Sequence, residues 1–126
     1  MLVLGLDTST SCGSIALVDS EKTLGEWSLN VRGTHAGRLL PGIQHLLGET
    51  GIEIGQIDGF AVAAGPGSFT GLRIALATAK TLSLVTGKPL AGIPTLDVLV
   101  ENVPFMEGLI CPALHARKGE IFAAVY

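Results

Sequence analysis

Charge is scarce in this chain of 126 residues. Charged residues make up 15% of it, with eight Lys and Arg against eleven Asp and Glu, so the net charge is −3. So few basic residues argue against independent nucleic-acid binding, which needs clustered cations to neutralise phosphates. The apolar share is nevertheless 48%. Because a small domain has much surface for its volume, we expect a partner to cover exposed apolar area.

Cysteine and long apolar runs are scarce as well. Cys12 and Cys111 lie far apart without a CxxC spacing. We therefore expect two buried, reduced thiols in a cytoplasmic protein rather than a disulfide or a metal site. No stretch approaches the roughly 18–20 apolar residues of a membrane span. The N-terminus lacks a basic region and reaches Asp7 too early for a signal peptide.

The three histidines are few and isolated. His35 and His45 are ten residues apart, so they do not share a face of an ideal helix and cannot chelate together. His115 has no neighbour with metal-ligand spacing. Solvated or capping roles are therefore expected for all three, and no Ser-His-Asp set can be assembled from local spacing.

What the sequence does contain is an alternation of strand and helix patterns. Strands are expected at 2–9, 12–20, 23–31, 57–65 and 90–93, with helices from about 34, at 68–86 and at 94–102. Two more strands are expected within 109–126, around a turn at Lys118 and Gly119. The order β-β-β-α-β-α-β-α predicts an α/β fold with a mixed five-stranded sheet covered by helices.

Two boundaries are open in this pattern. The first helix is expected from about Thr34 as N-cap, but Pro41 interrupts it, so either the helix kinks there or it starts nearer Arg38. Gly48 and Gly51 end it. The chain stops at Tyr126 inside an apolar strand pattern. We therefore expect residues 1–107 to form one domain and residues 108–126 to begin a truncated second domain.

The loop after the first strand reads Asp7-Thr8-Ser9-Thr10. Its amides and hydroxyls can hold phosphate oxygens, while the carboxylate can hold a metal-bound water. An ordinary polar hairpin has the same pattern, so both interpretations stay open.

A second polar turn, "GPGSFTG", leads into the long helix. Gly65, Gly67 and Ser68 can present an anion site at the positive end of the helix dipole. The turn is not a Walker loop, since no Lys follows its last glycine, and the acidic residue of a dinucleotide fingerprint is missing. A tight strand-to-helix turn remains the alternative.

The helix at 68–86 is almost free of charge. Gly71, Ala75 and Thr78 form a stripe of small residues that lets a second helix approach closely, and Arg73 and Lys80 share one face. A helix that is apolar all round is buried on more than one side. Packing inside the domain explains this pattern, and so does a subunit interface, which the low charge favours.

Several stretches together resemble the TsaB (YeaZ) family: "GLDTSTSCGSIAL", "THAGRLLPGIQHLL", "GPGSFTGLRIA", "GIPTL" and "HARKGEIFAAVY". The resemblance runs the length of the chain and implies an actin/hexokinase-like fold, related to ribonuclease H, of two domains. It also implies a non-catalytic subunit needed for threonylcarbamoyl transfer to adenosine 37 of transfer RNA. The family usually reads Asp-Ala-Arg where this chain has His115-Ala116-Arg117.

The resemblance also implies partners: the catalytic paralogue TsaD, the ATPase TsaE, and a homodimer when the paralogue is absent. Transfer RNA is then reached only through the complex. The chain itself is expected to hold no cofactor firmly, with ATP or ADP left open for the complete complex. The expected interface consists of Thr70, Gly71, Arg73, Ile74, Ala75, Ala77, Thr78, Lys80 and Thr81, together with His35 and Leu39.

Two enzymatic alternatives compete with the scaffold. A sugar-kinase-like phosphotransferase would use Asp7 and the two glycine-containing loops. A metal-dependent glycoprotease is the weaker alternative, because Thr95 and Leu99 occupy the positions of the paralogue's metal-binding histidine pair. Neither side chain replaces an imidazole as a transition-metal ligand, so no metal site is expected.

Overall fold

The computed structural model describes residues 1–30 and 35–126. The sheet strands are β1 (Val3–Asp7), β2 (Cys12–Val18), β3 (Thr23–Asn30), β4 (Gly59–Ala63) and β5 (Leu90–Ile93). The helices are α1 (Leu39–Thr50), the 3-10 turn η1 (Ile54–Gln56), α2 (Phe69–Thr86) and α3 (Thr95–Val100). A hairpin of β6 (Ala113–Arg117) and β7 (Glu120–Ala123) follows.

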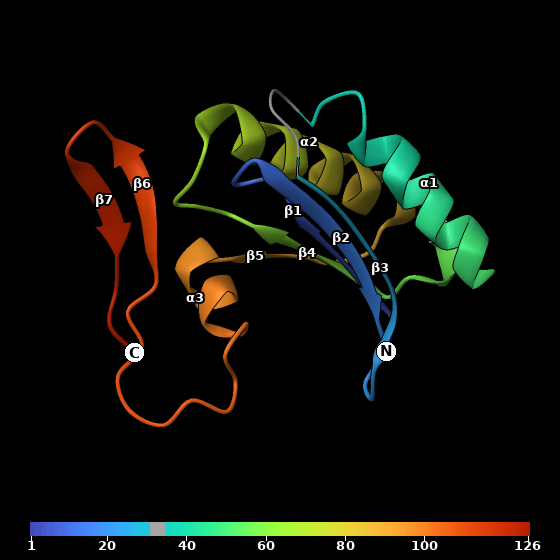
Figure 1. Ribbon diagram of the computed structural model, residues 1–126. Helices are drawn as coiled ribbons and strands as arrows, with labels where there is room; N and C mark the ends of the chain where they lie inside the picture. Colours follow the sequence, from blue (N-terminus) through green and yellow to red (C-terminus); the bar gives the residue numbers. More distant parts are fainter. Residues whose placement is uncertain (31–34) are drawn as a thin grey trace.

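The five strands form one mixed sheet in the order β3-β2-β1-β4-β5 (Figure 1). β1 pairs with β2, and β2 with β3, in antiparallel register, whereas β1–β4 and β4–β5 are parallel. The parallel pairs require crossovers, which α1 and α2 supply. The prediction of a mixed five-stranded sheet is confirmed.

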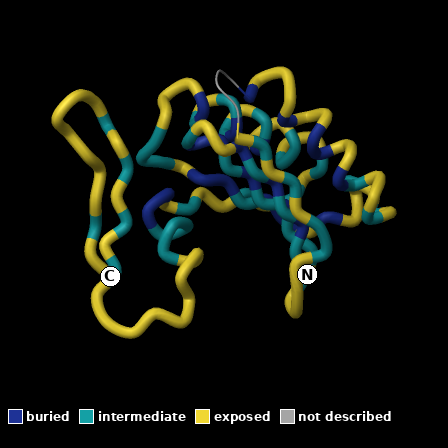
Figure 2. The backbone as a smooth tube through the Cα atoms, in the orientation of Figure 1, coloured by how far each residue is buried: buried dark blue, intermediate teal, exposed yellow. Residues whose placement is uncertain are grey.

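The core lies between the sheet and the two long helices. Alternate strand residues point toward α1 and α2, and Figure 2 shows the buried chain concentrated in this layer. Each buried aliphatic or aromatic side chain contributes about 1.5–3 kcal/mol. The central members are Leu4, Leu6, Ile15, Leu17, Phe60 and Val62.

Helix α1 begins later than its apolar periodicity alone indicates. Arg38 is the N-cap and Pro41 lies in the first turn, where a missing N–H breaks no helical bond. The start near Arg38 is therefore confirmed, and Thr34 lies outside the described residues. Gly51 ends the helix in the left-handed conformation with φ 69°, whereas Gly48 lies inside it.

Helix α2 begins and ends at the predicted residues. The Ser68 side chain caps it by accepting a hydrogen bond from Gly71 N at 3.2 Å. Gly87 ends it with φ 69°. Along its length α2 packs chiefly on β4 and also contacts β1 and β5.

The remaining elements lie away from this layer. Helix α3 lies on the opposite side of the sheet from α1 and α2, and the β6–β7 hairpin stands beside it (Figure 1). The predicted turn at Lys118 and Gly119 joins the two hairpin strands. Among the described residues, no helix is long and apolar enough to cross a bilayer.

The two thiols differ from expectation in one respect. Cys12 and Cys111 are both free, and both are exposed rather than buried. Cys12 is the first residue of β2, at the rim of the sheet, and Cys111 precedes the exposed hairpin. The prediction that both thiols are buried, which was based on their apolar sequence neighbours, is therefore wrong. Neither helices nor another sheet cover the chain at these two positions.

Candidate functional site

Two loops meet where the parallel strands β1 and β4 end. The loop at residues 8–11 follows β1, the glycine turn at 64–68 follows β4, and these strands are hydrogen-bonded neighbours. Ser68 N donates a hydrogen bond to Ser9 O at 2.7 Å, which joins the loops directly. Ligands of α/β sheets bind at the carboxyl ends of strands, so the two predicted phosphate loops lie at the expected edge.

Close packing explains two of the glycines here. A Cβ at Gly67 would lie 2.7 Å from both Ser9 Cβ and Ser9 O. A Cβ at Gly71 would lie 1.8 Å from Thr8 O, and Thr8 Oγ1 donates a hydrogen bond to Gly71 O at 2.6 Å. Both glycines are therefore needed for contact between the loop and the start of α2, whether or not a ligand binds.

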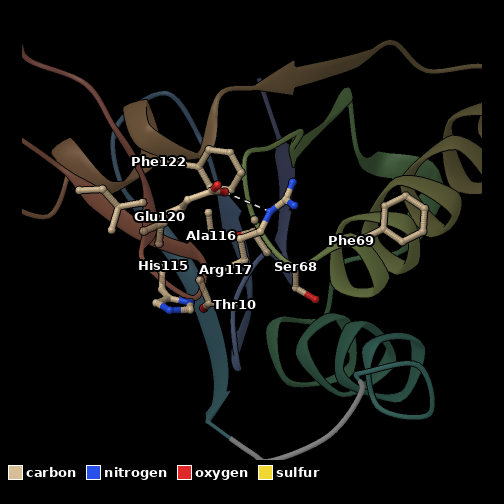
Figure 3. Close-up of a pocket in the computed structure, with 12 residues that line it drawn as sticks. Thr10, Ser68, Phe69, His115, Ala116, Arg117, Glu120 and Phe122 are labelled. Carbon is tan, nitrogen blue, oxygen red and sulfur yellow. Dashed lines mark ion pairs between the residues drawn. The ribbon is translucent and has the colours of Figure 1, made fainter.

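The largest cavity near these loops, about 850 Å³, lies between them and the hairpin (Figure 3). Four predicted residues line it: Ser9, Thr10, Gly67 and Ser68. Ser9 is 2% exposed, and its Oγ has no hydrogen-bond partner within the described residues. Buried hydroxyls are normally paired, so this oxygen is unusual among the residues of the two loops.

The structure does not bring the other predicted phosphate residues into this cavity. Asp7 Oδ1 accepts a hydrogen bond from Ser9 N at 2.8 Å, and Asp7 lines a separate cavity of about 190 Å³ with Gly5 and Ala16. Thr8 is buried beside α2 and lines a third cavity of about 380 Å³. Asp7 and the glycine turn therefore line different cavities.

Gly65 is hydrogen-bonded to Thr95, for which the sequence analysis predicted no structural or functional role. Gly65 N donates to Thr95 Oγ1 at 3.1 Å, and Thr95 N donates to Gly65 O at 2.8 Å. Thr95 is 1% exposed, so its hydroxyl is committed to the glycine turn. Among the described residues, no three His, Cys, Asp or Glu side chains gather as metal ligands would.

The hairpin supplies residues that the motif search missed. Its contribution to the large cavity includes Arg117, Glu120 and Phe122, and Figure 3 shows the ion pair that joins Arg117 to Glu120. The pair is 3.0 Å long and exposed, so it contributes little stability. The sequence signal for these residues was confined to the stretch "HARKGEIF", which no local spacing connected to the loops.

His35 is the exception among the histidines. It is 3% exposed, and its Nε2 donates a hydrogen bond to Thr10 O at 3.1 Å. Gly13 makes room for the ring, because a Cβ there would lie 2.7 Å from His35 Nδ1. Of the expected solvated or capping roles, solvation is wrong for His35, because its ring is buried and bonded to a loop carbonyl. His45 and His115 are exposed.

The predicted interface is divided by the structure. Ala75 is fully buried, Gly71 is buried against Thr8, and Leu39 is 1% exposed, all within their own domain. With His35 they cannot form part of a surface that meets another chain. Gly71 and Ala75 of the small-residue stripe instead let α2 approach its own sheet closely, which corrects their interpretation as a dry partner surface. Thr78, the third member of the stripe, lines the groove toward α1.

The opposite side of α2 is open. Thr70, Arg73, Ala77, Lys80 and Thr81 are exposed, and Ile74 and Thr78 are half-buried. A shallow apolar groove of about 200 Å³ runs between α2 and α1, with Leu40 on the α1 side. Beyond these residues Leu84 and Val85 are 84% and 79% exposed.

Comparisons with known proteins point in one direction. A protein-family model described as TsaD, tRNA N6-adenosine threonylcarbamoyltransferase, matches residues 30–126. The whole chain is 32% identical to the tRNA threonylcarbamoyladenosine biosynthesis protein TsaB of Bacillus subtilis and covers 55% of it. It is 34% identical to TsaB of Escherichia coli, with 100% of this chain and 55% of that protein covered. The chain therefore spans about half the length of the curated relatives it matches.

The fold agrees with this similarity. The solved structure of YeaZ from Pseudomonas aeruginosa superposes with a TM-score of 0.92 at 31% sequence identity. The match covers 99% of this chain and 59% of that one.

Proposed function

This chain belongs to the family described as TsaD, tRNA N6-adenosine threonylcarbamoyltransferase, and from that premise we propose that it acts as a TsaB-type accessory subunit. Its role is to pair with the catalytic paralogue TsaD, together with the ATPase TsaE, in the cytoplasm. The paired enzyme then transfers threonylcarbamoyl to adenosine 37 of transfer RNA. The observation that carries the proposal is the similarity to TsaB proteins along the entire chain.

A non-catalytic role is consistent with the chemistry of the site. The Thr95 hydroxyl, which would have to replace a metal-binding imidazole, is buried and bonded to Gly65 N. Leu99 offers no lone pair. The glycine turn is thus held by its contact with Thr95, and neither Thr95 nor Leu99 of α3 is free to act as a metal ligand. Residues 108–126 begin a second domain in this proposal.

The surface proposed for the paralogue is the open side of α2 with the adjoining groove. Its members are Thr70, Ala77 and Thr81, bordered by Leu40 of α1 and by Arg73 and Lys80. Alanine and threonine let a partner helix approach closely, and Leu84 adds apolar area. A second copy of the chain occupies the same surface only when the paralogue is absent.

Mass in solution tests this proposal. Mixing the chain with the paralogue should give a heterodimer by native mass spectrometry or light scattering, and Ala77→Glu should abolish it. Ala91→Glu is the matched control, because Ala91 is an exposed alanine of β5 paired with Ala61, on the sheet face away from α2. Two well-folded proteins that stay separate would overturn the scaffold role.

A second candidate, nucleotide or phosphate binding, is favoured by one observation. Ser9, whose buried Oγ has no hydrogen-bond partner within the described residues, lines the large cavity together with Ser68 at the N-terminus of α2. Anions bind at such helix ends. Calorimetry with ATP should then give binding that Ser9→Ala weakens and Asp7→Asn leaves nearly unchanged, because Asp7 faces another cavity. No heat at millimolar ATP would remove this candidate.

A further inference from the structure

Helix α2 carries charge of one sign only. Its sequence, FTGLRIALATAKTLSLVT, contains Arg73 and Lys80 and no acidic residue. Both cations are exposed. Within residues 1–30 and 35–126 the only ion pair joins Arg117 to Glu120, so neither cation is neutralised by a carboxylate. The open side of α2 is therefore a positive surface.

The two cations lie in register along the helix. Seven residues make nearly two turns, so both side chains project from the same face, about 10 Å apart along the axis. The Arg73 guanidinium lies over the Phe69 ring, 5.2 Å from its centroid, which holds it in place. On the adjoining side lie the exposed Ala77 and the groove toward Leu40. The surface around Ala77, which is suited to helix packing, is thus bordered by the positive charges of Arg73 and Lys80.

We propose that Arg73 and Lys80 select the partner by charge. The occupant is a helix of a different protein, with a small or apolar strip flanked by carboxylates about two turns apart. This inference rests on the proposed function, since it concerns the same surface. It specifies that the partner helix carries carboxylates, and it explains why a second copy of this chain binds the surface less well than the partner does.

Symmetry disfavours the second copy. In a two-fold pair each surface meets itself, so a residue and its counterpart exchange contacts. Antiparallel α2 helices that cross at Ala77, midway between the cations, would place Arg73 of each copy opposite Lys80 of the other. Like charges in apposition reduce affinity and act against the wrong partner. Helix α1 carries one acidic residue, Glu49, in its last turn.

A protein helix fits this surface better than RNA does. Two cations on an otherwise apolar and hydroxyl-bearing face neutralise few phosphates, and binding to a nucleic-acid backbone needs many more. The exposed Leu84 and the groove beside Leu40 would meet no apolar group on a phosphate backbone.

Charge reversal is the test. The double variant Arg73→Glu with Lys80→Glu should weaken binding to the paralogue at least about tenfold at low salt. The wild-type complex should weaken with added salt, whereas binding of the variant should strengthen with salt, because screening relieves the repulsion between its glutamates and the partner's carboxylates. A mixture of wild type with the double variant should associate more tightly than either alone, because opposite charges then face each other.

Three comparisons make the outcome decisive. Lys22→Glu with Lys118→Glu reverses two exposed lysines away from α2 and should change nothing. Arg73→Gln with Lys80→Gln should show a smaller loss than the reversal. Unchanged affinity in the α2 reversal, while Ala77→Glu still abolishes the complex, would overturn the charge inference and leave the scaffold proposal intact. Competition by transfer RNA for the free chain, lost in the reversal, would also overturn it.

Discussion

Thr8 and Gly71 hold each other at a separation that no side chain at position 71 permits. Thr8 O lies 1.8 Å from where a Gly71 Cβ would stand, and Thr8 Oγ1 donates to Gly71 O at 2.6 Å. The contact joins the loop after β1 to the first turn of α2, across 63 residues of sequence. The N-terminus of α2 is therefore fixed to the sheet by a glycine that sequence reasoning assigned to a partner surface.

Gly71→Ala should destabilise the fold, because either the loop or the helix must move. We expect a loss of roughly 1–3 kcal/mol in the free energy of unfolding, as for overpacked sites in general. Gly48→Ala is the control: it lies inside α1, and nothing lies within 4 Å of its would-be Cβ. That change should gain about 0.5–1 kcal/mol by helix propensity. Equal stability of the two variants by urea denaturation would contradict the packing argument.

Ala75→Glu and Ala77→Glu should separate stability from association. Ala75 is fully buried on the inner face of α2, so a carboxylate there would be cut off from solvent and should cost about 3 kcal/mol or more. Ala77, two residues on, is exposed, and its glutamate should change stability by less than about 0.5 kcal/mol. Thermal unfolding of both variants checks this. A stable Ala75→Glu variant would mean that the burial of Ala75 is wrong.

Local signals predicted the elements of this fold well. Ser68 and Gly87 bound α2 as an N-cap and a left-handed C-cap, and both act through residues within one turn. Pro41 likewise located the start of α1 near Arg38. These features depend on backbone geometry that neighbouring residues decide. They could therefore be inferred without knowledge of the tertiary structure.

Long-range packing was not accessible in the same way. A stripe of glycine and alanine lets a helix approach closely, but it does not say whether a partner helix or its own sheet lies opposite. Ala75 is fully buried on a helix that packs against β4 and the neighbouring strands of its own sheet. Burial of His35 depends on Gly13, a residue of β2 whose missing side chain leaves space for the ring. Nothing in the spacing of either residue indicated the pairing.

The Thr95 hydroxyl should matter as an acceptor rather than as bulk. Thr95→Val keeps the shape but leaves Gly65 N without its partner, which should cost about 1–3 kcal/mol. Thr95→Ser keeps the acceptor and loses a methyl group, so it should cost about 1 kcal/mol. Hydrogen exchange at the Gly65 amide should accelerate in the valine variant and stay slow in the serine variant. The reverse order would show that packing of the methyl group dominates.

The turn between β2 and β3 should give a pH-dependent stability. Asp19 Oδ1 accepts hydrogen bonds from Glu21 N and Lys22 N, both at 2.8 Å, and these bonds hold the pKa of the Asp19 carboxyl below its ordinary value. Because the folded pKa is the lower one, the stabilisation is complete above the unfolded pKa, near 4. It is lost as the pH falls through the folded pKa.

Asp19→Asn removes this charge while keeping an oxygen acceptor, and Asp19→Ala removes both. Wild type should exceed the asparagine variant in melting temperature by a constant small margin above about pH 5, and the margin should vanish below the folded pKa. The alanine variant should stay less stable than wild type in acid as well, because it also lacks the turn's acceptor. Carbon-detected NMR titration of Asp19 gives the pKa directly. A midpoint at or above the ordinary aspartate value of about 4 would contradict the role assigned to the two backbone amides.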